Sequence, residues 1–135
     1  MIKFLKVGDN FYQNIEPNMV DENGNEIWNI PNDPTQLKSA IADTLVWLAK
    51  QKLNNVLDKY AYNGLADVQF YANQTTPDPE AQAILNWYQA YDDGIWNYID
   101  NELPNITVLD DLLALDIKAV EEQIFQNSIA TSPLP

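Results

Sequence analysis

The stretch that decides the fold is DPTQLKSAIADTLVWLAKQKLNNVLDKY, residues 33–60. Asp33 followed by Pro34 is typical of a helix start, because aspartate accepts hydrogen bonds from free backbone N–H groups and proline fits the first helical position. Apolar side chains then recur every three or four residues, as on one face of an α-helix. They are Leu37, Ile41, Leu45, Leu48, Val56 and Tyr60, with Trp47 and Leu53 beside them. We expect a long helix from Pro34 to about Tyr62, ended by Asn63-Gly64.

A second long helix is expected from Asp78-Pro79-Glu80, which repeats the start pattern, to Pro104. Gly94 inside it costs about 1 kcal/mol relative to alanine, and it marks either a close approach by another helix or a weak point. The apolar row comprises Ala81, Ile84, Leu85, Tyr88, Tyr91, Ile95, Ile99 and Leu103. Before this helix, LADVQFYANQ predicts one or two helical turns, with Leu65, Val68 and Phe70 or Tyr71 turned inward.

A third helix is expected to begin at Thr107, with Asp110 as its capping-box partner, and to continue past Ile124 without a break. Two hairpin signals lie at the N-terminus. One predicts strands on either side of a turn at Gly8-Asp9 or Asp9-Asn10. The other predicts a type I′ turn at Asn23-Gly24, between short strands at 19–20 and 27–28.

These elements predict a mainly α protein, a small helical bundle of two long helices and a C-terminal helix, with a short N-terminal β-hairpin element. We expect a single domain over residues 1–127, with the hairpin element at 1–32 and the helical body at 33–127. Residues 128–135, SIATSPLP, are expected to form a flexible tail.

The composition removes most kinds of active site. The chain has no Cys, His or Arg. Without them there is no thiol nucleophile, no neutral-pH imidazole base, no thiolate zinc site and no bidentate phosphate clamp. A mechanism that uses carboxylates alone is left open, although no spacing favours it. We therefore expect no enzyme activity, no catalytic residue, no metal site and no cofactor.

The charge is acidic and uneven. Residues 1–59 carry six lysines and eight acids, and residues 60–135 carry one lysine and twelve acids, so the net charges are −2 and −11. Such a C-terminal half is repelled by nucleic acid and by anionic membranes, and we expect neither as a partner. Excess acid favours a basic partner surface, or it only keeps a small protein soluble.

The second long helix is apolar over more of its circumference than one packing partner needs. This fits a central position in a bundle or a surface shared with another chain, and interfaces favour Trp and Tyr. The candidate partner-binding residues are Trp87, Tyr91, Trp96 and Tyr98, with the neighbouring acids Asp92 and Asp93. The alternative is that the aromatic side chains are buried in the core and the acids face water.

One ordered set of residues resembles a known family. It runs Lys59-Tyr60, Tyr62-Asn63, Tyr71-Ala72, Glu80-Ala81-Gln82-Ala83, Trp87, Trp96 and Tyr98. Over about residues 50–103 the sequence is similar to a helix pair in small tail-region proteins of tailed bacteriophages and prophages, of the tail-fibre or tail-fibre-assembly kind. It departs from that pattern at Asp92-Asp93-Gly94, where such stretches are less acidic.

The resemblance implies a non-enzymatic structural component or assembly chaperone that binds a tail-fibre or baseplate protein. It would act in the host cytoplasm during assembly, or remain in the virion. A second copy of the chain is also left open as a partner. The alternative function is an acidic inhibitor that imitates nucleic acid and blocks a host DNA-binding enzyme.

Overall fold

The computed structural model describes residues 1–16, 19–25 and 33–135. Within these residues the chain is mainly α-helical with one two-stranded sheet, which confirms the expected fold class. The elements are β1 (Ile2–Val7), β2 (Asn10–Ile15), α1 (Pro34–Lys59), α2 (Leu65–Ala72), α3 (Pro79–Asn97), the π-helical turn η1 (Tyr98–Glu102), the 3-10 turn η2 (Leu103–Asn105), α4 (Leu109–Leu113) and α5 (Ile117–Thr131). None of the helices described is both long and apolar enough to cross a membrane.

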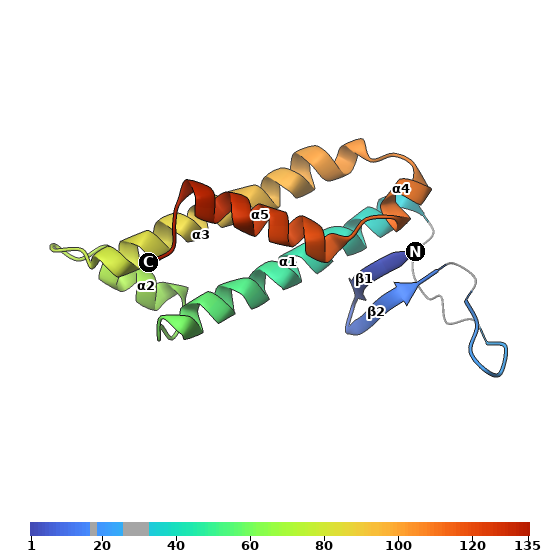
Figure 1. Cartoon of the computed structure of the whole chain (residues 1–135), viewed down its shortest axis with the longest axis horizontal. Helices are drawn as coiled ribbons and strands as arrows, with labels where there is room; N and C mark the ends of the chain where they lie inside the picture. The colour runs from blue at the N-terminus through green and yellow to red at the C-terminus, as the bar shows by residue number, and fades with distance from the viewer. Residues whose placement is uncertain (17–18, 26–32) are drawn as a thin grey trace.

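Three long helices, α1, α3 and α5, lie along the long axis of the molecule, and α3 runs opposite to the other two (Figure 1). The hairpin packs on α1 at one end, and α2 packs on α3 at the other. Between these ends, α3 lies against α5 more extensively than against α1. The third side of the bundle, between α1 and α3, is therefore the most open.

The first hairpin is antiparallel and turns at Gly8-Asp9, as one of the two sequence alternatives predicts. Gly8 has a φ of 59°, the left-handed conformation that a two-residue hairpin loop favours at its first position. Thr44 of α1 fastens the hairpin to the bundle. Its hydroxyl accepts from the Lys6 N–H at 3.0 Å and donates to the Ala40 carbonyl at 2.7 Å.

The second turn differs from the type I′ prediction. Gly24 has a φ of 79°, but Asn23 is not in the left-handed region. The Asp21 side chain accepts hydrogen bonds from the N–H groups of Asn23 and Asn25. These bonds favour a wider loop, closed by an Asp21 N–H bond to the Asn25 carbonyl at 2.8 Å. The strand predicted at 27–28 lies outside the described residues.

Helix α1 begins as predicted, and it ends three residues earlier than predicted. The Asp33 side chain accepts from the N–H groups of Thr35 and Gln36. At the other end, Tyr62 N–H bonds to Leu57 C=O at 2.9 Å and Ala61 N–H bonds to Asp58 C=O at 3.2 Å. This pair of bonds is a Schellman motif.

The residue at the turning point of that motif is Ala61, with a φ of 61°. The motif usually places a glycine there, because the left-handed conformation costs an L-residue free energy. The Asn63-Gly64 stop therefore lies beyond the end of α1, and Gly64 instead precedes α2.

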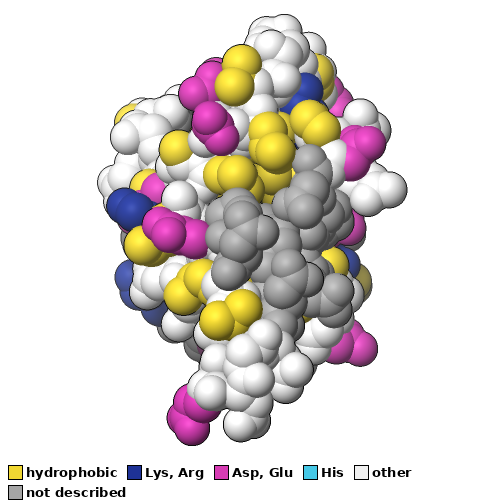
Figure 2. Space-filling model, turned by 90° about the vertical axis from the view of Figure 1, so that its right-hand side faces the viewer, with side chains coloured by type: hydrophobic (Ala, Val, Ile, Leu, Met, Phe, Trp, Pro, Cys, Tyr) yellow, Lys and Arg dark blue, Asp and Glu magenta, His cyan; other side chains and the backbone are white. Residues whose placement is uncertain are grey.

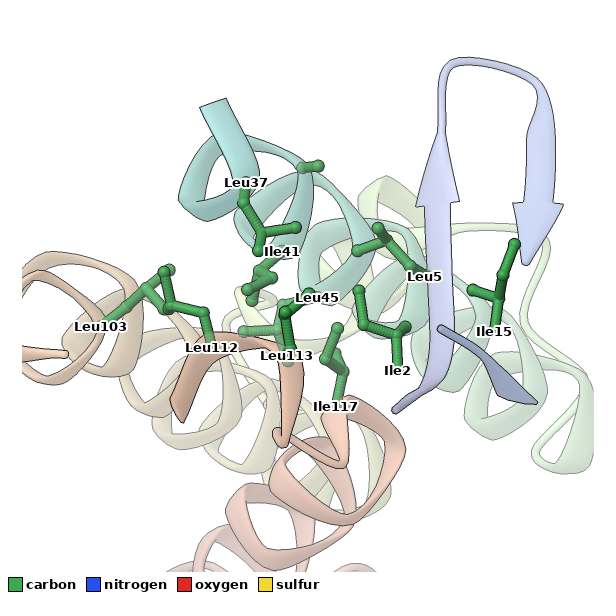
Figure 3. Close-up of a cluster of buried hydrophobic side chains, with 11 residues drawn as sticks. Ile2, Leu5, Ile15, Leu37, Ile41, Leu45, Leu103, Leu112, Leu113 and Ile117 are labelled. Atoms are coloured by element: carbon green, nitrogen blue, oxygen red, sulfur yellow. The ribbon is translucent and has the colours of Figure 1, made fainter. Parts of the chain in front are cut away.

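The core consists of two clusters along the bundle. The first joins the hairpin to the N-terminal half of α1, α4 and the start of α5, as Figure 3 shows. Its buried members are Ile2, Leu5, Ile15, Leu37, Ala40, Ile41, Leu45, Leu103, Leu112, Leu113 and Ile117. The second joins the C-terminal half of α1 to α2 and α3, with α5 packed against it. Its buried members are Val56, Leu57, Val68, Ala72, Ala81, Ile84, Trp87, Tyr91 and Ile95.

The second predicted helix starts where expected, because the Asp78 side chain accepts from the N–H groups of Glu80 and Ala81. It is not uniformly α-helical to Pro104. It passes into the π-helical turn η1, where the Leu103 N–H bonds to the Tyr98 carbonyl five residues earlier. Leu103 then lies in the first cluster.

The third predicted helix is two helices. Thr107 is not the N-terminal cap, since Val108 holds that position. The chain turns after Leu113, and the Asp116 side chain starts α5 by accepting from the Ala119 N–H at 3.2 Å. Helix α5 then reaches Thr131, so the first residues of the predicted tail are helical.

On α2, Val68 and Ala72 are the buried residues. The prediction that Phe70 or Tyr71 turns inward is wrong, since both are exposed.

Candidate functional site

The side chains of α1 and α3 line a groove of about 190 Å³ on the open side of the bundle. Helix α1 contributes Val46, Ala49, Lys50 and Leu53, and α3 contributes Tyr88, Tyr91, Asp92, Ile95 and Trp96. On each helix these positions follow the i, i+3, i+4, i+7 spacing of one helix face. The groove is mostly apolar, with one basic and one acidic side chain.

Trp96 is the most exposed large hydrophobic side chain of this groove, with 45% of its surface accessible. Beside it, Tyr88 is half-buried. Burial raises the pKa of the Tyr88 hydroxyl, and the nearby Asp92 carboxylate raises it further. Tyr88 therefore stays neutral at physiological pH, so the groove offers a hydroxyl and an indole beside one carboxylate.

Two of the six candidate residues, Trp87 and Tyr91, lie in the core. They are 0% and 1% exposed, and their rings stack with centroids 5.3 Å apart. Phe125 of α5 meets both rings edge-on. The assignment of Trp87 to a partner-binding surface is therefore corrected, and Tyr91 lines the groove only as a buried side chain beneath its surface. The physical reason is that α5 covers this side of α3, which the sequence pattern of α3 could not reveal.

The polar atoms of these buried aromatics are satisfied by α5. The Trp87 Nε1–H donates to the Ser128 hydroxyl at 3.0 Å, and the Tyr91 hydroxyl donates to the Glu121 carboxylate at 2.7 Å. Ser128 and Glu121 are themselves buried. The sequence analysis did not identify these α5 residues as hydrogen-bond partners of aromatic side chains. The available signal is a polar residue on an otherwise apolar helix face.

Burial of the Glu121 side chain raises its pKa, against the opposing effects of the Tyr91 hydrogen bond and of Lys52. The Lys52 ammonium lies 3.8 Å from Glu121 and 3.2 Å from Glu122, and it also sits over the Phe125 ring at 4.3 Å. This network is a polar link between α1, α3 and α5, in which Tyr91 and Glu121 are buried and Glu122 is exposed.

The remaining candidates divide between two faces. Asp92 and Trp96 line the groove, whereas Asp93 lines a hollow on the other side of α3, beside Gly94 and Asn127. Tyr98 is half-buried, and burial followed by Glu102 raises the pKa of its hydroxyl. The structure therefore brings Asp92 and Trp96 together and separates them from Asp93 and Tyr98.

The α1 wall of the groove was not identified as a site from the sequence. Lys50 is its basic residue, and Val46, Ala49 and Leu53 are its apolar ones. Leu53 was recognised only as a widening of the α1 row. The available signal was the width of the apolar row of α1, which is greater than contact with one neighbouring helix requires.

Among the described residues, no group of three or more carboxylates is placed to hold a metal ion. The ion pairs found in the described part of the chain do not join Lys50 to Asp92. Both charges therefore remain available at the groove. Among the described residues, the groove therefore presents an apolar surface with one lysine and one aspartate that do not pair with each other.

Comparison of the chain with models of protein families, with curated proteins and with solved structures gives no match in any of the three.

Proposed function

We propose that this protein acts without catalysis, by binding a protein partner in the groove between α1 and α3. The observation that carries the proposal is Trp96, a large aromatic side chain left exposed at an apolar groove. Tryptophan is among the residues that contribute most to binding when a partner covers them. The groove lies between two antiparallel helices, a geometry that accepts the apolar face of a third helix.

The partner that fits is an amphipathic helix whose apolar side chains pack on Leu53, Tyr88 and Trp96. A basic residue on its flank would meet Asp92, and the net charge of −13 favours a basic partner generally. The resemblance to phage tail-region proteins supports a tail-fibre or baseplate protein as that partner. Residues 50–103, over which it holds, include the whole α3 wall of the groove.

On this proposal the protein is a structural component or an assembly chaperone. It would work in the host cytoplasm while tails are built, or stay in the virion. An exposed apolar groove suits a chaperone, because it can cover an apolar helix of a fibre subunit until that helix reaches its final place.

The test has two stages. First, tagged protein is used to capture partners from host lysate after prophage induction, with washes at low and high salt. Second, the affinity of a captured tail protein is measured for Trp96→Ala and for Val108→Ala, an exposed apolar residue outside the groove. We expect Trp96→Ala to weaken binding roughly 10- to 30-fold and Val108→Ala to change it little.

Equal binding by both variants would refute the groove as the binding site. Melting of each variant is measured alongside, because loss of stability with unchanged binding per folded molecule would make Trp96 a packing residue. Capture of fibre protein that survives high salt supports an apolar contact.

The acidic-inhibitor function is kept as a second candidate because Asp93, Asp100, Glu102, Asp110 and Asp111 are all exposed. On the face seen in Figure 2, however, acidic side chains are scattered among hydrophobic and neutral ones. A DNA-processing enzyme that is captured at low salt and lost at high salt would favour this candidate over the groove.

A further inference from the structure

A second exposed aromatic surface lies at the opposite end of the bundle from the hairpin, on α2 and the turn before it (Figure 1). Phe70 and Tyr71 are 61% and 44% exposed, and Phe70 is the most exposed large hydrophobic side chain in the described part of the chain. Their ring centroids are 5.2 Å apart and meet edge-on, and Tyr71 lies 6.3 Å from Tyr62. We call Tyr62, Phe70 and Tyr71 the aromatic patch.

Carboxylates surround the aromatic patch. Asp78 is held next to it because its N–H donates to the Tyr71 carbonyl at 3.1 Å. The Asp67 carboxylate is held near Tyr62 because it accepts from the neighbouring Asn63 N–H at 3.2 Å. The Asp67 side chain is thus fixed near Tyr62, and the Asp78 backbone is fixed beside Tyr71 while its carboxylate caps α3.

The pKa of the Tyr62 hydroxyl is also affected by nearby carboxylates. Burial raises its pKa to about 12, with further contributions from Glu80 and then from Asp78 and Asp67. Three carboxylates therefore act on one edge of the aromatic patch. The sequence supplies no lysine or arginine between Lys59 and Lys118 to balance them.

Elsewhere the chain covers aromatic rings with its own lysines. Lys118 lies 4.3 Å from the Phe4 ring centroid and Lys52 lies 4.3 Å from that of Phe125. Lys6 and Lys59 lie over Phe11 and Tyr60 at 6.0 and 5.4 Å. Among the described residues, the rings of the aromatic patch have no such cation, although the carboxylates around them favour one.

We propose that the aromatic patch, with Asp67, Asp78 and Glu80, binds an arginine or lysine side chain of a protein partner. The faces of the rings attract a cation, and the carboxylates pair with it. Arginine fits better than lysine, because its planar guanidinium stacks on aromatic rings and bonds a carboxylate through two N–H groups. This surface is separate from the groove and does not depend on the function proposed for it.

The test is a titration of the whole ¹⁵N-labelled protein, at low ionic strength, with the blocked peptide acetyl-Gly-Arg-Gly-Arg-Gly-amide. The control peptide carries citrulline in place of arginine, which keeps the shape and removes the charge. We expect the arginine peptide to shift amide signals within residues 62–80 and the citrulline peptide to leave them unchanged.

Phe70→Ala separates binding at the patch from general attraction to an acidic protein, because it leaves the net charge unchanged. Its affinity for the arginine peptide should fall about two- to fivefold. Asp67→Asn with Glu80→Gln should also weaken binding. The matched pair Asp110→Asn with Asp111→Asn removes two exposed charges at the other end of the bundle and should change it less.

Trp96→Ala should bind the arginine peptide as the unaltered protein does, so failure of the groove and failure of the aromatic patch are told apart. The proposal is overturned if Phe70→Ala binds the peptide with unchanged affinity. It is equally overturned if the shifts spread over all the acidic helices, or if the citrulline peptide binds as well.

Discussion

Replacing Gly94 by alanine is expected to destabilise the protein, although alanine is the better helix former. An added Cβ at this position would lie 2.8 Å from the Cγ2 atom of Ile124 on α5. Carbon atoms pack best at about 3.5–4.0 Å. The contacting methyl is attached directly to the Ile124 Cβ, so it moves only if the side chain changes rotamer or the helices separate.

The magnitude follows from two opposing contributions. Glycine to alanine within a helix stabilises by about 1 kcal/mol. Forcing an extra carbon into a packed contact costs about 1–3 kcal/mol. The net loss in the free energy of unfolding for Gly94→Ala is therefore about 1 kcal/mol, within a range of about 0–2 kcal/mol.

The sign should reverse when the contacting methyl is removed. In an Ile124→Ala background the new Cβ has space, so Gly94→Ala should stabilise by about 1 kcal/mol. The coupling energy between the two positions is then about 2 kcal/mol. The assay is urea unfolding of both single variants and the double variant, followed by tryptophan fluorescence and far-ultraviolet circular dichroism.

A matched pair at Gln89, an exposed position of the same helix, measures the helix preference alone. Gln89→Ala should be more stable than Gln89→Gly by about 1 kcal/mol. If Gly94→Ala stabilises equally with and without Ile124, the close contact between α3 and α5 does not limit this position and the reasoning is refuted.

Three further changes test the ends and the centre of the bundle. Ala61→Gly should raise the free energy of unfolding by about 1 kcal/mol, because glycine adopts the left-handed conformation without the steric cost; an unchanged urea midpoint would contradict the Schellman ending. Ser128→Ala should lower the free energy of unfolding by about 1–3 kcal/mol, because it leaves the buried Trp87 N–H without its acceptor. Thermal melting should show this loss for Ser128→Ala and not for Ser128→Thr, which keeps the hydroxyl. Glu121→Gln should become progressively more stable relative to the unaltered protein as pH rises from below the ordinary glutamate pKa through the raised pKa of folded Glu121. The folded state holds this proton more tightly than the unfolded state, so the stability it contributes is present at low pH and lost on ionisation; a stability difference that stays constant with pH would show that Glu121 titrates normally.

Local signals in the sequence predicted the starts of α1 and α3 correctly. Asp33 and Asp78 cap α1 and α3 as expected, because capping involves only the next two or three residues. The turn at Gly8-Asp9 formed for the same reason. Helix ends were predicted less well, since the end of α1 depends on Ala61 accepting an unfavourable conformation that Tyr62 and its neighbours stabilise.

The candidate site could be predicted only in part. The width of the apolar face of α3 was evident, and it does contact more than one neighbour. Which side of that face stays open depends on α5, whose Phe125 and Ser128 cover Trp87 and leave Trp96 exposed. No pattern within α3 distinguishes these two tryptophans, because both lie on its broad aromatic surface.

The sequence by itself determined the helical class, the two capped helix starts, the hairpin at the N-terminus and the acidic C-terminal half. These follow from interactions between near neighbours and from composition. Only the tertiary structure decided which aromatics are buried, where the groove lies and why Gly94 is glycine. Those depend on contacts between residues far apart in the chain, such as Gly94 with Ile124 and Tyr91 with Glu121, and the periodicity of one helix does not specify the partner that covers it.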